Sequence, residues 1–335
     1  MNGRPPSKVL LTGGHPNGGV ASFAEALRCG FAELGLAAEV ISPAKIPARL
    51  GEVRDPGVLK ILSTTAVFAA PLARRAICMA HGVPCAAHQG WTRTLAILAS
   101  YRMANACRGV QLVEVSEYSA LHLRAIFGLR VDAVIRNPVH PLFMEAMPED
   151  GAKREAITYV GRLHCAKNVD RLLPAIRDVL DENPGLRAWI VGDGPMRPEL
   201  ERIHHGDERI AFTGALTPVE VRERLRRTRV FVSGNPAEPF GIAYLEALSQ
   251  GCAVVMPASG GGLEIAPERI GTGIQLFSAS VERTEVAAAL RNALQAAPLP
   301  PLPLTAYSAR SVAEAYLSLD SRFNAQGRLD AEDGR

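Results

Sequence analysis

Short apolar segments alternate with longer segments of helical periodicity along almost the whole chain. In its first part the apolar segments are 8–12, 38–42, 65–70, 84–88 and 110–116, and the helical pattern covers 19–34, 71–80, 93–107 and 117–127. Strands that alternate with helices indicate parallel sheets covered by helices on both faces. The first part of the chain is therefore predicted to be one α/β domain.

The alternation stops at 136–156, "RNPVHPLFMEAMPEDGAKREA", where three prolines and a charged cluster indicate a linker. It then resumes, with strands expected at 156–161, 187–192, 209–214, 229–234 and 252–256, and helices at 168–181, 217–227, after Gly241 and at 281–296. We therefore predict two Rossmann-like, doubly wound parallel-sheet domains, 1–145 and 146–306. A further helix is expected at 307–322, after the proline-rich "PLPPLPL".

Composition and charge exclude several classes of protein. Hydrophobic residues make up 47% of the 335 residues and charged residues 21%, which is typical of a globular chain. A net charge of +3 does not indicate a nucleic-acid partner, and the arginine-rich run 222–229 is interpreted as a solvated helix face. The six cysteines lack zinc-ligand spacing, so no metal is expected. Without a membrane-spanning stretch or a signal-peptide pattern, the prediction is a cytoplasmic protein.

Ligands of open parallel sheets bind beyond the carboxyl ends of the strands, so each strand-to-helix junction is a candidate site. The first junction, "TGGHPNGGVASF", has Gly18 and Gly19 where a helix begins, and its free N–H groups suit an anion or a hydroxyl. It does not match GxGxxG, which disfavours a nicotinamide dehydrogenase. A tight turn without a ligand remains the alternative.

Two further junctions carry residues suited to a substrate. His88 follows the apolar run of "PCAAHQGW", although a lone histidine is more often structural than catalytic. Arg162 and Lys167 lie on the loop that enters the helix at 168, where both cations can bind a diphosphate; surface charges are the alternative. Gly192 and Gly194 permit close approach to a ligand in "VGDGP", or form only a turn.

Two carboxylates surround a helix start in "EPFGIAYLEALSQGCAVV". Glu238 precedes the helix, where the helix dipole favours an anion, whereas Glu246 lies inside it among apolar neighbours and needs hydrogen-bond donors. Between them, the N–H groups of Phe240, Gly241 and Ile242 suit a phosphate. Sugar hydroxyls, a diphosphate and ribose hydroxyls match this arrangement. A glycosidase pair is disfavoured, because its acids would face each other across the scissile bond.

At these residues the chain resembles the retaining GT-B glycosyltransferases of family 4, also called glycosyl transferases group 1. Glu238 and Glu246 match that family's E-x7-E signature. The order of the other motifs is also similar, over about residues 8–320: "HPNGGVASFAEAL", "PCAAHQG", "VSEYSALHLRAIFG", "VIRNPV", "YVGRLHCAKNVDRLL", "VGDGP", "FTGAL", "ASGGGLEIA" and "YSARSVAEAYLSL".

The resemblance implies two domains facing a cleft, with the acceptor on the first domain and the nucleotide-sugar donor on the second. The helix 307–322 would cross back to the first domain. Glu238 would contact the donor sugar, Glu246 the ribose, Arg162 and Lys167 the diphosphate, His88 the transferred sugar, and Gly18 and Gly19 the phosphate or acceptor. Two departures from the family pattern are "NPVH" in the linker, which affects acceptor contacts, and Asn168 where glycine is common. Asparagine tolerates the left-handed backbone that glycine adopts.

The expected function is transfer of a sugar, with retention and without a metal, from a nucleotide-diphosphate sugar to an acceptor hydroxyl. No other cofactor is expected, and the acceptor is a glycan, a lipid-linked glycan or a small molecule. An epimerase of the same fold and a catalytically silent sugar-nucleotide-binding protein are the alternatives. Residues 93–107 are interpreted as a helix packed on the sheet; peripheral contact with the inner face of a membrane is the second interpretation.

Overall fold

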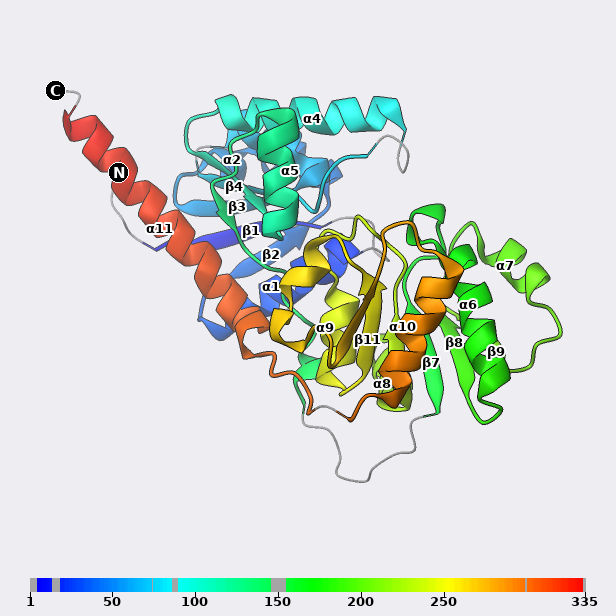
Figure 1. Cartoon of the computed structure of the whole chain (residues 1–335). Coiled ribbons are helices and arrows are strands. Elements are labelled where there is room, and N and C mark those ends of the chain that lie inside the picture. The colour runs from blue at the N-terminus through cyan, green and yellow to red at the C-terminus, as the bar shows by residue number, and fades with distance from the viewer. Residues whose placement is uncertain are drawn as a thin grey trace. The chain divides into compact units, whose positions relative to one another are not determined.

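The computed structural model describes residues 5–13, 19–73, 75–85, 90–145, 155–298 and 300–333 (Figure 1). The contacts between residues divide the chain into two compact units. Unit 1 comprises Met1–Pro141 and Thr305–Arg335, and unit 2 comprises Leu142–Leu304. The chain therefore passes between the units twice, once near residue 141 and once near residue 304.

Unit 1 is built on a six-stranded parallel sheet. Its strands are β1 (Lys8–Thr12), β2 (Ala38–Ile41), β3 (Val58–Ser63), β4 (Ala76–Met79), β5 (Val110–Glu114) and β6 (Ala133–Val134). They lie in the order β2-β1-β3-β4-β5-β6, and every neighbouring pair is parallel. β3, β4 and β5 are buried along their whole length, as expected for strands covered on both faces. The predicted parallel sheet is confirmed.

Helices lie between the strands of unit 1, and α5 shows clear start and stop signals. They are α1 (Gly19–Glu33), α2 (Leu50–Arg54), the 3₁₀ segment η3 (Thr64–Leu72), α4 (Trp91–Ala106), α5 (Glu117–Phe127) and α11 (Ala309–Asp333). For α5 the hydroxyl of Ser116 accepts from the N–H of Ser119, and Gly128 ends the helix in the left-handed region. These helices surround the sheet and complete the unit.

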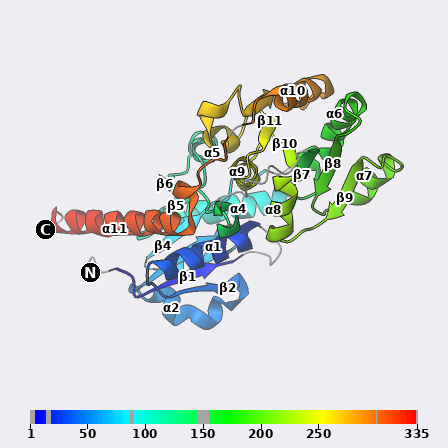
Figure 2. The same cartoon turned by 90° about the horizontal axis from the view of Figure 1, so that it is seen from below.

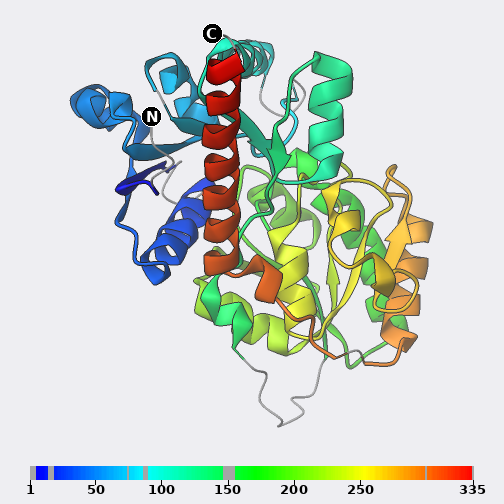
Figure 3. The same cartoon turned by 90° about the vertical axis from the view of Figure 1, so that its left-hand side faces the viewer.

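The last helix, α11, belongs to unit 1 although it ends the chain. Figures 2 and 3 show it beside α1, and the two helices pack together closely. At Gly30 a side-chain Cβ would lie 2.0 Å from the carbonyl oxygen of Ala309, so glycine is required there. Arg75 forms an ion pair with the buried Asp320, with Nε donating to Oδ1 at 2.7 Å. Both contacts fasten α11 to the rest of unit 1.

Three predictions for unit 1 are wrong, and all concern apolar runs. Residues 65–70 belong to η3 instead of a strand, 71–80 contain β4 instead of a helix, and 84–85 form no strand; 86–88 lie outside the described residues. The strand that lies beside β4 in the sheet is β3, and it carries Lys60 in its centre. Lys60 is fully buried because its Nζ donates to the carbonyls of Asp55 at 2.8 Å and Val58 at 2.7 Å.

Unit 2 is a second parallel sheet of six strands. They are β7 (Ala156–Val160), β8 (Arg187–Val191), β9 (Ile210–Gly214), β10 (Thr228–Val232), β11 (Ala253–Pro257) and β12 (Ile274–Phe277), in the order β12-β11-β10-β7-β8-β9. The helices are α6 (Val169–Glu182), α7 (Arg197–Ile203), α8 (Pro218–Arg226), α9 (Ile242–Ser249) and α10 (Arg283–Gln295). α6 and α10 pack side by side over the core (Figure 2). The doubly wound arrangement is confirmed, and β12 is the strand of this sheet that the sequence analysis missed.

The arginine-rich run of α8 is not a plain solvated face. Arg222 donates to the carbonyl of Leu142 at 2.9 Å, and Arg224 and Arg227 lie over the ring of Trp189 at 4.8 and 5.5 Å. Cation–π contacts of this kind stabilise the fold and need no external anion. The interpretation as a solvated face is therefore wrong in detail, because most of this charge serves internal packing.

Candidate functional site

The strand order of unit 2 reverses between β7 and β10. From β7 the sheet continues through β8 to β9, and from β10 it continues through β11 to β12 in the other direction. Loops that leave the carboxyl ends of two such strands diverge and form a crevice, where ligands of doubly wound sheets bind. The loop after β7 carries Arg162 and Lys167, and the loop after β10 carries Glu238.

Lys167 and Glu238 meet at this switch point. The Nζ of Lys167 donates to the Glu238 carboxylate at 2.6 Å, and the amide nitrogen of Asn235 donates to the same oxygen at 2.9 Å. Their side chains are 28% and 19% exposed, so the pair can still be reached from solvent. The structure thus brings together a cation and a carboxylate that the sequence assigned to the diphosphate and the sugar.

The backbone around Lys167 is held by Asn168. Asn168 has a left-handed backbone, with φ 49°, and its side-chain amide donates to the carbonyl of Gly234 at 2.8 Å. A Cβ at Gly234 would lie 2.8 Å from the carbonyl oxygen of Lys167. The expectation that asparagine adopts the left-handed conformation is confirmed, and its amide also joins the two loops, which glycine could not do.

A glycine-rich turn at 258–262 supports the Glu238 loop from the other side. The N–H of Gly261 donates to the carbonyl of Glu238 at 2.8 Å, and the hydroxyl of Ser259 donates to the carbonyl of Pro236 at 2.7 Å. Gly260 has φ 88°, and a Cβ there would lie 2.9 Å from the Glu238 carbonyl. The backbone position of Glu238 is therefore determined before any ligand binds.

Helix α9 begins immediately after this loop. Gly241 is its N-cap with φ 95°, and a Cβ on Gly241 would lie 2.4 Å from the ring of Tyr244. Phe240 is buried and Ile242 is half-buried, so the side chains on both sides of the cap face protein. No described side chain caps the helix start, which leaves its first turn suited to an anion.

Glu246 lies one turn further along α9, between the buried residues Leu245 and Ala247. It is half-buried, and its carboxyl forms no hydrogen bond or ion pair with any residue in the described part of the chain. Desolvation by the surrounding protein raises its pKa to about 8. A carboxyl in this state can accept hydrogen bonds from ligand hydroxyls, and such donors would favour its ionised form.

Arg162 is exposed on the β7–α6 loop, and its guanidinium has no partner among the described residues. Its backbone is nevertheless fixed, since the hydroxyl of Tyr159 donates to the Arg162 carbonyl at 3.0 Å. Burial raises the pKa of Tyr159, so this hydroxyl stays protonated as a donor. Arg162 is therefore a cation on an anchored loop, available to a ligand.

Gly192 and Gly194 have a packing role that the sequence did not suggest. Their φ angles are 131° and 159°, and Cβ atoms there would lie 1.9 Å from the carbonyl oxygen of Gly161 and 2.3 Å from that of Leu163. The glycines let the β8–α7 turn pack against the loop that carries Arg162. Their contact with a ligand stays a prediction.

The remaining predicted residues belong to unit 1. Gly18 and His88 lie outside the described residues, and Gly19 is the first residue of α1. The described carboxyl edge of this sheet contributes groups that sequence reasoning missed. The hydroxyl of Thr12 accepts from the N–H of Ser63 at 2.7 Å, where β1 and β3 end at the switch point of this sheet. Their position at the ends of apolar runs was the available signal.

Glu114 is a further residue at the end of a unit 1 strand that the sequence analysis missed. It ends β5 and is fully buried, and its carboxylate accepts from the N–H of Val115 at 3.1 Å. Burial raises its pKa to about 8. In unit 2 the sequence likewise missed Asn235, which follows β10 and orients Glu238.

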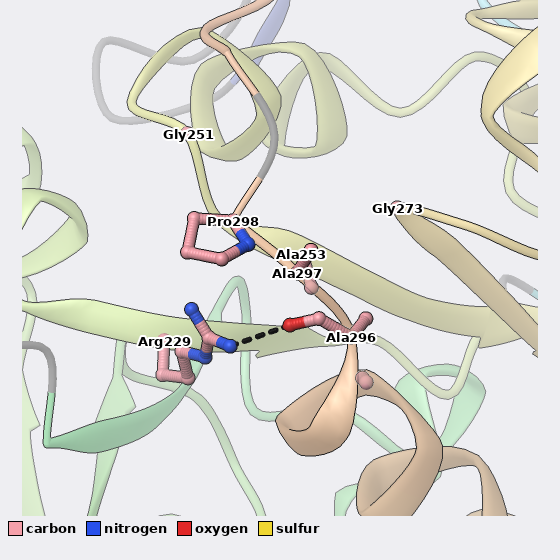
Figure 4. Close-up of a pocket in the computed structure, with 8 residues that line it drawn as sticks. Arg229, Gly251, Ala253, Gly273, Ala296, Ala297 and Pro298 are labelled. Carbon is pink, nitrogen blue, oxygen red and sulfur yellow. Dashed lines mark hydrogen bonds between the residues drawn. The ribbon is translucent and has the colours of Figure 1, made fainter.

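A small pocket lies at the opposite edge of the unit 2 sheet (Figure 4). Its lining comes from the amino ends of β10, β11 and β12 and from the end of α10: Arg229, Gly251, Ala253, Gly273, Ala293, Ala296, Ala297 and Pro298. The guanidinium of Arg229 donates to the carbonyl of Ala296 at 2.6 Å. Because its charged group is already bonded to backbone and its wall consists of small apolar residues, this pocket is not the candidate site.

Within the described ranges, no three His, Cys, Asp or Glu side chains are placed to hold a metal ion. None of the described helices is long and apolar enough to cross a membrane.

Comparison with known proteins relates unit 2 to a glycosyltransferase family. Residues 154–296 match the family model of glycosyl transferases group 1. The matched segment contains every candidate site residue of unit 2, and it excludes Gly18, Gly19 and His88. The resemblance to glycosyl transferases group 1 is thus supported for this part of the chain, while the retaining mechanism stays a prediction.

Curated relatives match less than half of the chain. Sulfoquinovosyl transferase SQD2 of Arabidopsis thaliana is 33% identical over 116 residues, which are 35% of this chain and 22% of that protein. A component of the phosphatidylinositol N-acetylglucosaminyltransferase of Homo sapiens is 32% identical over 153 residues, 44% of this chain and 31% of that protein. The matches thus span less than a third of either relative.

Solved structures resemble the whole chain. HepE of Anabaena, solved in complex with UDP and glucose, has a TM-score of 0.68 at 17% identity and covers 97% of this chain and 99% of its own. Sucrose-phosphate synthase of Thermosynechococcus elongatus has a TM-score of 0.68 at 15% identity. The match covers 98% of this chain and 99% of the synthase chain. WaaG, a glycosyltransferase involved in lipopolysaccharide biosynthesis, has a TM-score of 0.65 at 17% identity. The match covers 94% of this chain and 98% of the WaaG chain. The two sheets are those of the GT-B fold, as predicted.

Proposed function

We propose that this protein is a retaining glycosyltransferase of family 4 that transfers a sugar from a nucleotide-diphosphate sugar to an acceptor hydroxyl without a metal ion. One observation carries the proposal. Lys167 and Glu238 form an ion pair at the switch point of unit 2, beside a helix start without a side-chain cap and a desolvated Glu246. A cation, a helix N-terminus and two carboxylates in this order suit sugar, diphosphate and ribose.

In this proposal Glu246 accepts from the ribose hydroxyls, and the diphosphate binds at the start of α9 with Arg162 and Lys167. While no donor is bound, Lys167 also serves as the ion-pair partner of Glu238, which neutralises its charge. A diphosphate competes with Glu238 for the lysine, and Asn235 then keeps the carboxylate in place. Donor binding thereby frees an acceptor for the sugar hydroxyls beside the phosphate.

The chemistry follows from charge. As the bond from the sugar carbon to the phosphate oxygen breaks, negative charge develops on the diphosphate, and Arg162, Lys167 and the start of α9 stabilise it. The acceptor oxygen bonds to the sugar carbon on the face that the diphosphate leaves, and a leaving phosphate oxygen takes the acceptor's proton. The configuration of the sugar carbon is therefore retained. His88 and Glu238 orient the sugar instead of acting as a covalent nucleophile.

The donor and the acceptor are proposed by class. HepE has been solved with UDP, with UDP and glucose, and with UDP-glucose, and several relatives are named for lipid acceptors, including phosphatidylinositol. We infer a nucleoside-diphosphate sugar as donor and a hydroxyl of a glycan, a lipid-linked glycan or a small molecule as acceptor. Unit 1 would bind the acceptor, unit 2 the donor, and the reaction would take place in the cytoplasm.

Two other functions make different predictions. An epimerase would convert the nucleotide sugar without an acceptor, and a silent binding protein would leave it unchanged. The relatives named above are transferases or synthases, which favours transfer.

The test is incubation of the protein with UDP-glucose, UDP-N-acetylglucosamine and GDP-mannose, with and without a lipid and glycan extract as acceptor. We expect release of nucleoside diphosphate that depends on the extract, and a product whose anomeric proton in NMR has the configuration of the donor. Conversion of the donor sugar without diphosphate release would identify an epimerase. Binding of the donors without any conversion would indicate a silent protein, and an inverted product would overturn the retaining mechanism.

A further inference from the structure

Helix α4 exposes apolar side chains on the side that faces away from its own core. Trp91 is 74% exposed and Leu95 60% exposed, and Ala99 continues the same face at a spacing of four residues. We call Trp91, Leu95, Ala96, Ala99 and Arg102 the α4 face. Figure 1 shows α4 along the upper edge of unit 1.

The buried side of α4 holds the helix against the rest of unit 1. Thr94, Tyr101 and Ala104 are buried, and the helix packs on η3 and β5. The hydroxyl of Tyr101 forms a hydrogen bond with that of Thr64 at 3.1 Å. The expectation that this helix packs on the sheet therefore holds for one side, while the exposed side presents Trp91 and Leu95 close to Arg102.

The neighbouring segment η3 adds to the exposed apolar surface. Phe68 is 51% exposed and Leu72 is 39% exposed, and Pro71 between them is also exposed. Two adjacent elements of unit 1 thus present large apolar side chains to solvent. Large apolar side chains exposed on two elements that pack against each other indicate an interaction surface.

The charge of this region indicates what binds there. Between residues 56 and 113 the chain has no Asp or Glu, although it has 34 of them in all. Arg93, Arg102 and Arg108 are exposed, and none has an ion-pair partner among the described residues. Exposed apolar residues with a tryptophan, surrounded by unpaired arginines, are typical of contact with an anionic membrane surface.

A second copy of this chain fits the surface less well. A twofold dimer through the α4 face would bring Arg93 and Arg102 of both copies to one interface, with no acid nearby in sequence to balance them. Like charges across an interface oppose association. An anionic bilayer instead attracts each arginine.

We propose that the α4 face and the exposed residues of η3 dock on an anionic phospholipid bilayer. Trp91, Leu95 and Phe68 enter the boundary between headgroups and acyl chains, and Arg93 and Arg102 bind lipid phosphates. Unit 1 is thereby held at a membrane surface while the protein stays peripheral. The proposal concerns binding alone and does not depend on the transferase activity.

The test uses the full chain and vesicles of phosphatidylcholine, either pure or with about 30% phosphatidylglycerol to supply surface charge. We expect sedimentation with the anionic vesicles, weaker binding at high salt, and little binding to pure phosphatidylcholine. The fluorescence of Trp91 should shift to the blue on binding, measured in a Trp189→Phe background because Trp189 is the other tryptophan.

Variants separate the contribution of the apolar side chains from that of the arginines. Trp91→Ser with Leu95→Ser should weaken vesicle binding by at least about tenfold, and Arg93→Gln with Arg102→Gln by about 25-fold, since each arginine near an anionic surface is worth about fivefold. The matched control is Leu121→Ser with Ile126→Ser on α5, which are 62% and 64% exposed in the same unit. The control should bind vesicles like the parent.

Three outcomes would overturn the proposal. The first is absence of binding to anionic vesicles. The second is equal binding by the parent and the α4 variants, with circular dichroism showing that all are folded. The third is concentration-dependent self-association in analytical ultracentrifugation that Leu95→Ser abolishes, since this would identify the α4 face as a contact between copies of the chain.

Discussion

The Nζ of Lys167 lies 2.6 Å from the Glu238 carboxylate, although the two residues are 71 positions apart in the chain. They meet because β7 and β10 are neighbours at the switch point of the sheet. The pair neutralises Lys167, and in the proposed mechanism a diphosphate displaces the Glu238 carboxylate from this lysine.

Removal of either phosphate-binding cation should reduce turnover without unfolding the protein. We expect Lys167→Ala and Arg162→Ala each to lower kcat by about 10²–10³-fold, as for the loss of a group that stabilises charge in the transition state. The matched control is Arg171→Ala, an exposed arginine at the start of α6 that donates to the carbonyl of Ser280. Near-normal turnover in either site variant, with unchanged thermal melting, would refute the phosphate role.

Nucleotide binding should release a proton from Glu246. Burial raises the pKa of this carboxyl to about 8, so at pH 7 it is mostly protonated; ribose hydroxyls that donate to it favour the ionised form. Calorimetric titrations with nucleoside diphosphate in two buffers of different ionisation heat measure the release. Glu246→Gln should bind nucleotide more weakly and release no proton.

The same carboxyl makes stability depend on pH. Between about pH 4.5 and 8 the folded protein keeps the Glu246 proton that the unfolded chain has lost, so the free energy of unfolding falls as pH rises through this window. Glu246→Gln should make the slope of stability against pH less negative than in the parent. An unchanged slope would show that Glu246 is ionised in the folded protein.

A chelator should leave the activity intact. In the proposed mechanism Arg162, Lys167 and the start of α9 neutralise the leaving diphosphate, which is the task a divalent cation performs in other transferases. Initial rates after dialysis against EDTA should equal those before it. Complete loss of activity, with recovery on addition of Mg²⁺ or Mn²⁺, would exclude the metal-independent mechanism.

Donor binding should draw the two units together. The proposed residues are divided between the units, with His88 in unit 1 and Lys167, Glu238 and Glu246 in unit 2, and the chain connects the units at two places. The radius of gyration in small-angle scattering should therefore fall when nucleoside diphosphate is added to the parent. Glu246→Ala should lose nucleotide binding and this compaction together. No change in the parent at saturating nucleotide would contradict a site shared by both units.

Loss of the Asp320 carboxylate should destabilise unit 1 strongly. Asp320→Ala leaves Arg75, whose side chain is only 12% exposed, without its ion-pair partner, which typically costs about 3–5 kcal/mol. Glu314→Ala on the same helix is the control, because its pair with Arg310 is exposed and worth about 0–1 kcal/mol. Urea unfolding measures both; an equal effect of the two substitutions would show that the Arg75–Asp320 pair does not fasten α11.

Much of the fold followed from the sequence where periodicity and helix signals agreed. α6, with its apolar face buried and its polar face exposed, and α5, between Ser116 and Gly128, were predicted within one or two residues. The E-x7-E spacing likewise identified the start of α9. Periodicity did not suffice for continuous apolar runs such as 65–70, because a buried strand and a buried 3₁₀ segment are then equally apolar.

The sequence by itself determined which residue types follow each strand, since a side chain's place after an apolar run is a local property. Only the tertiary structure decided which of these residues meet. The pairing of Lys167 with Glu238 depends on the order of strands in the sheet, and the glycines at 192 and 194 are explained by the carbonyls of Gly161 and Leu163 on a neighbouring loop. Strand order and close approach between loops are set by packing among distant segments, which no local pattern of apolar and polar residues encodes.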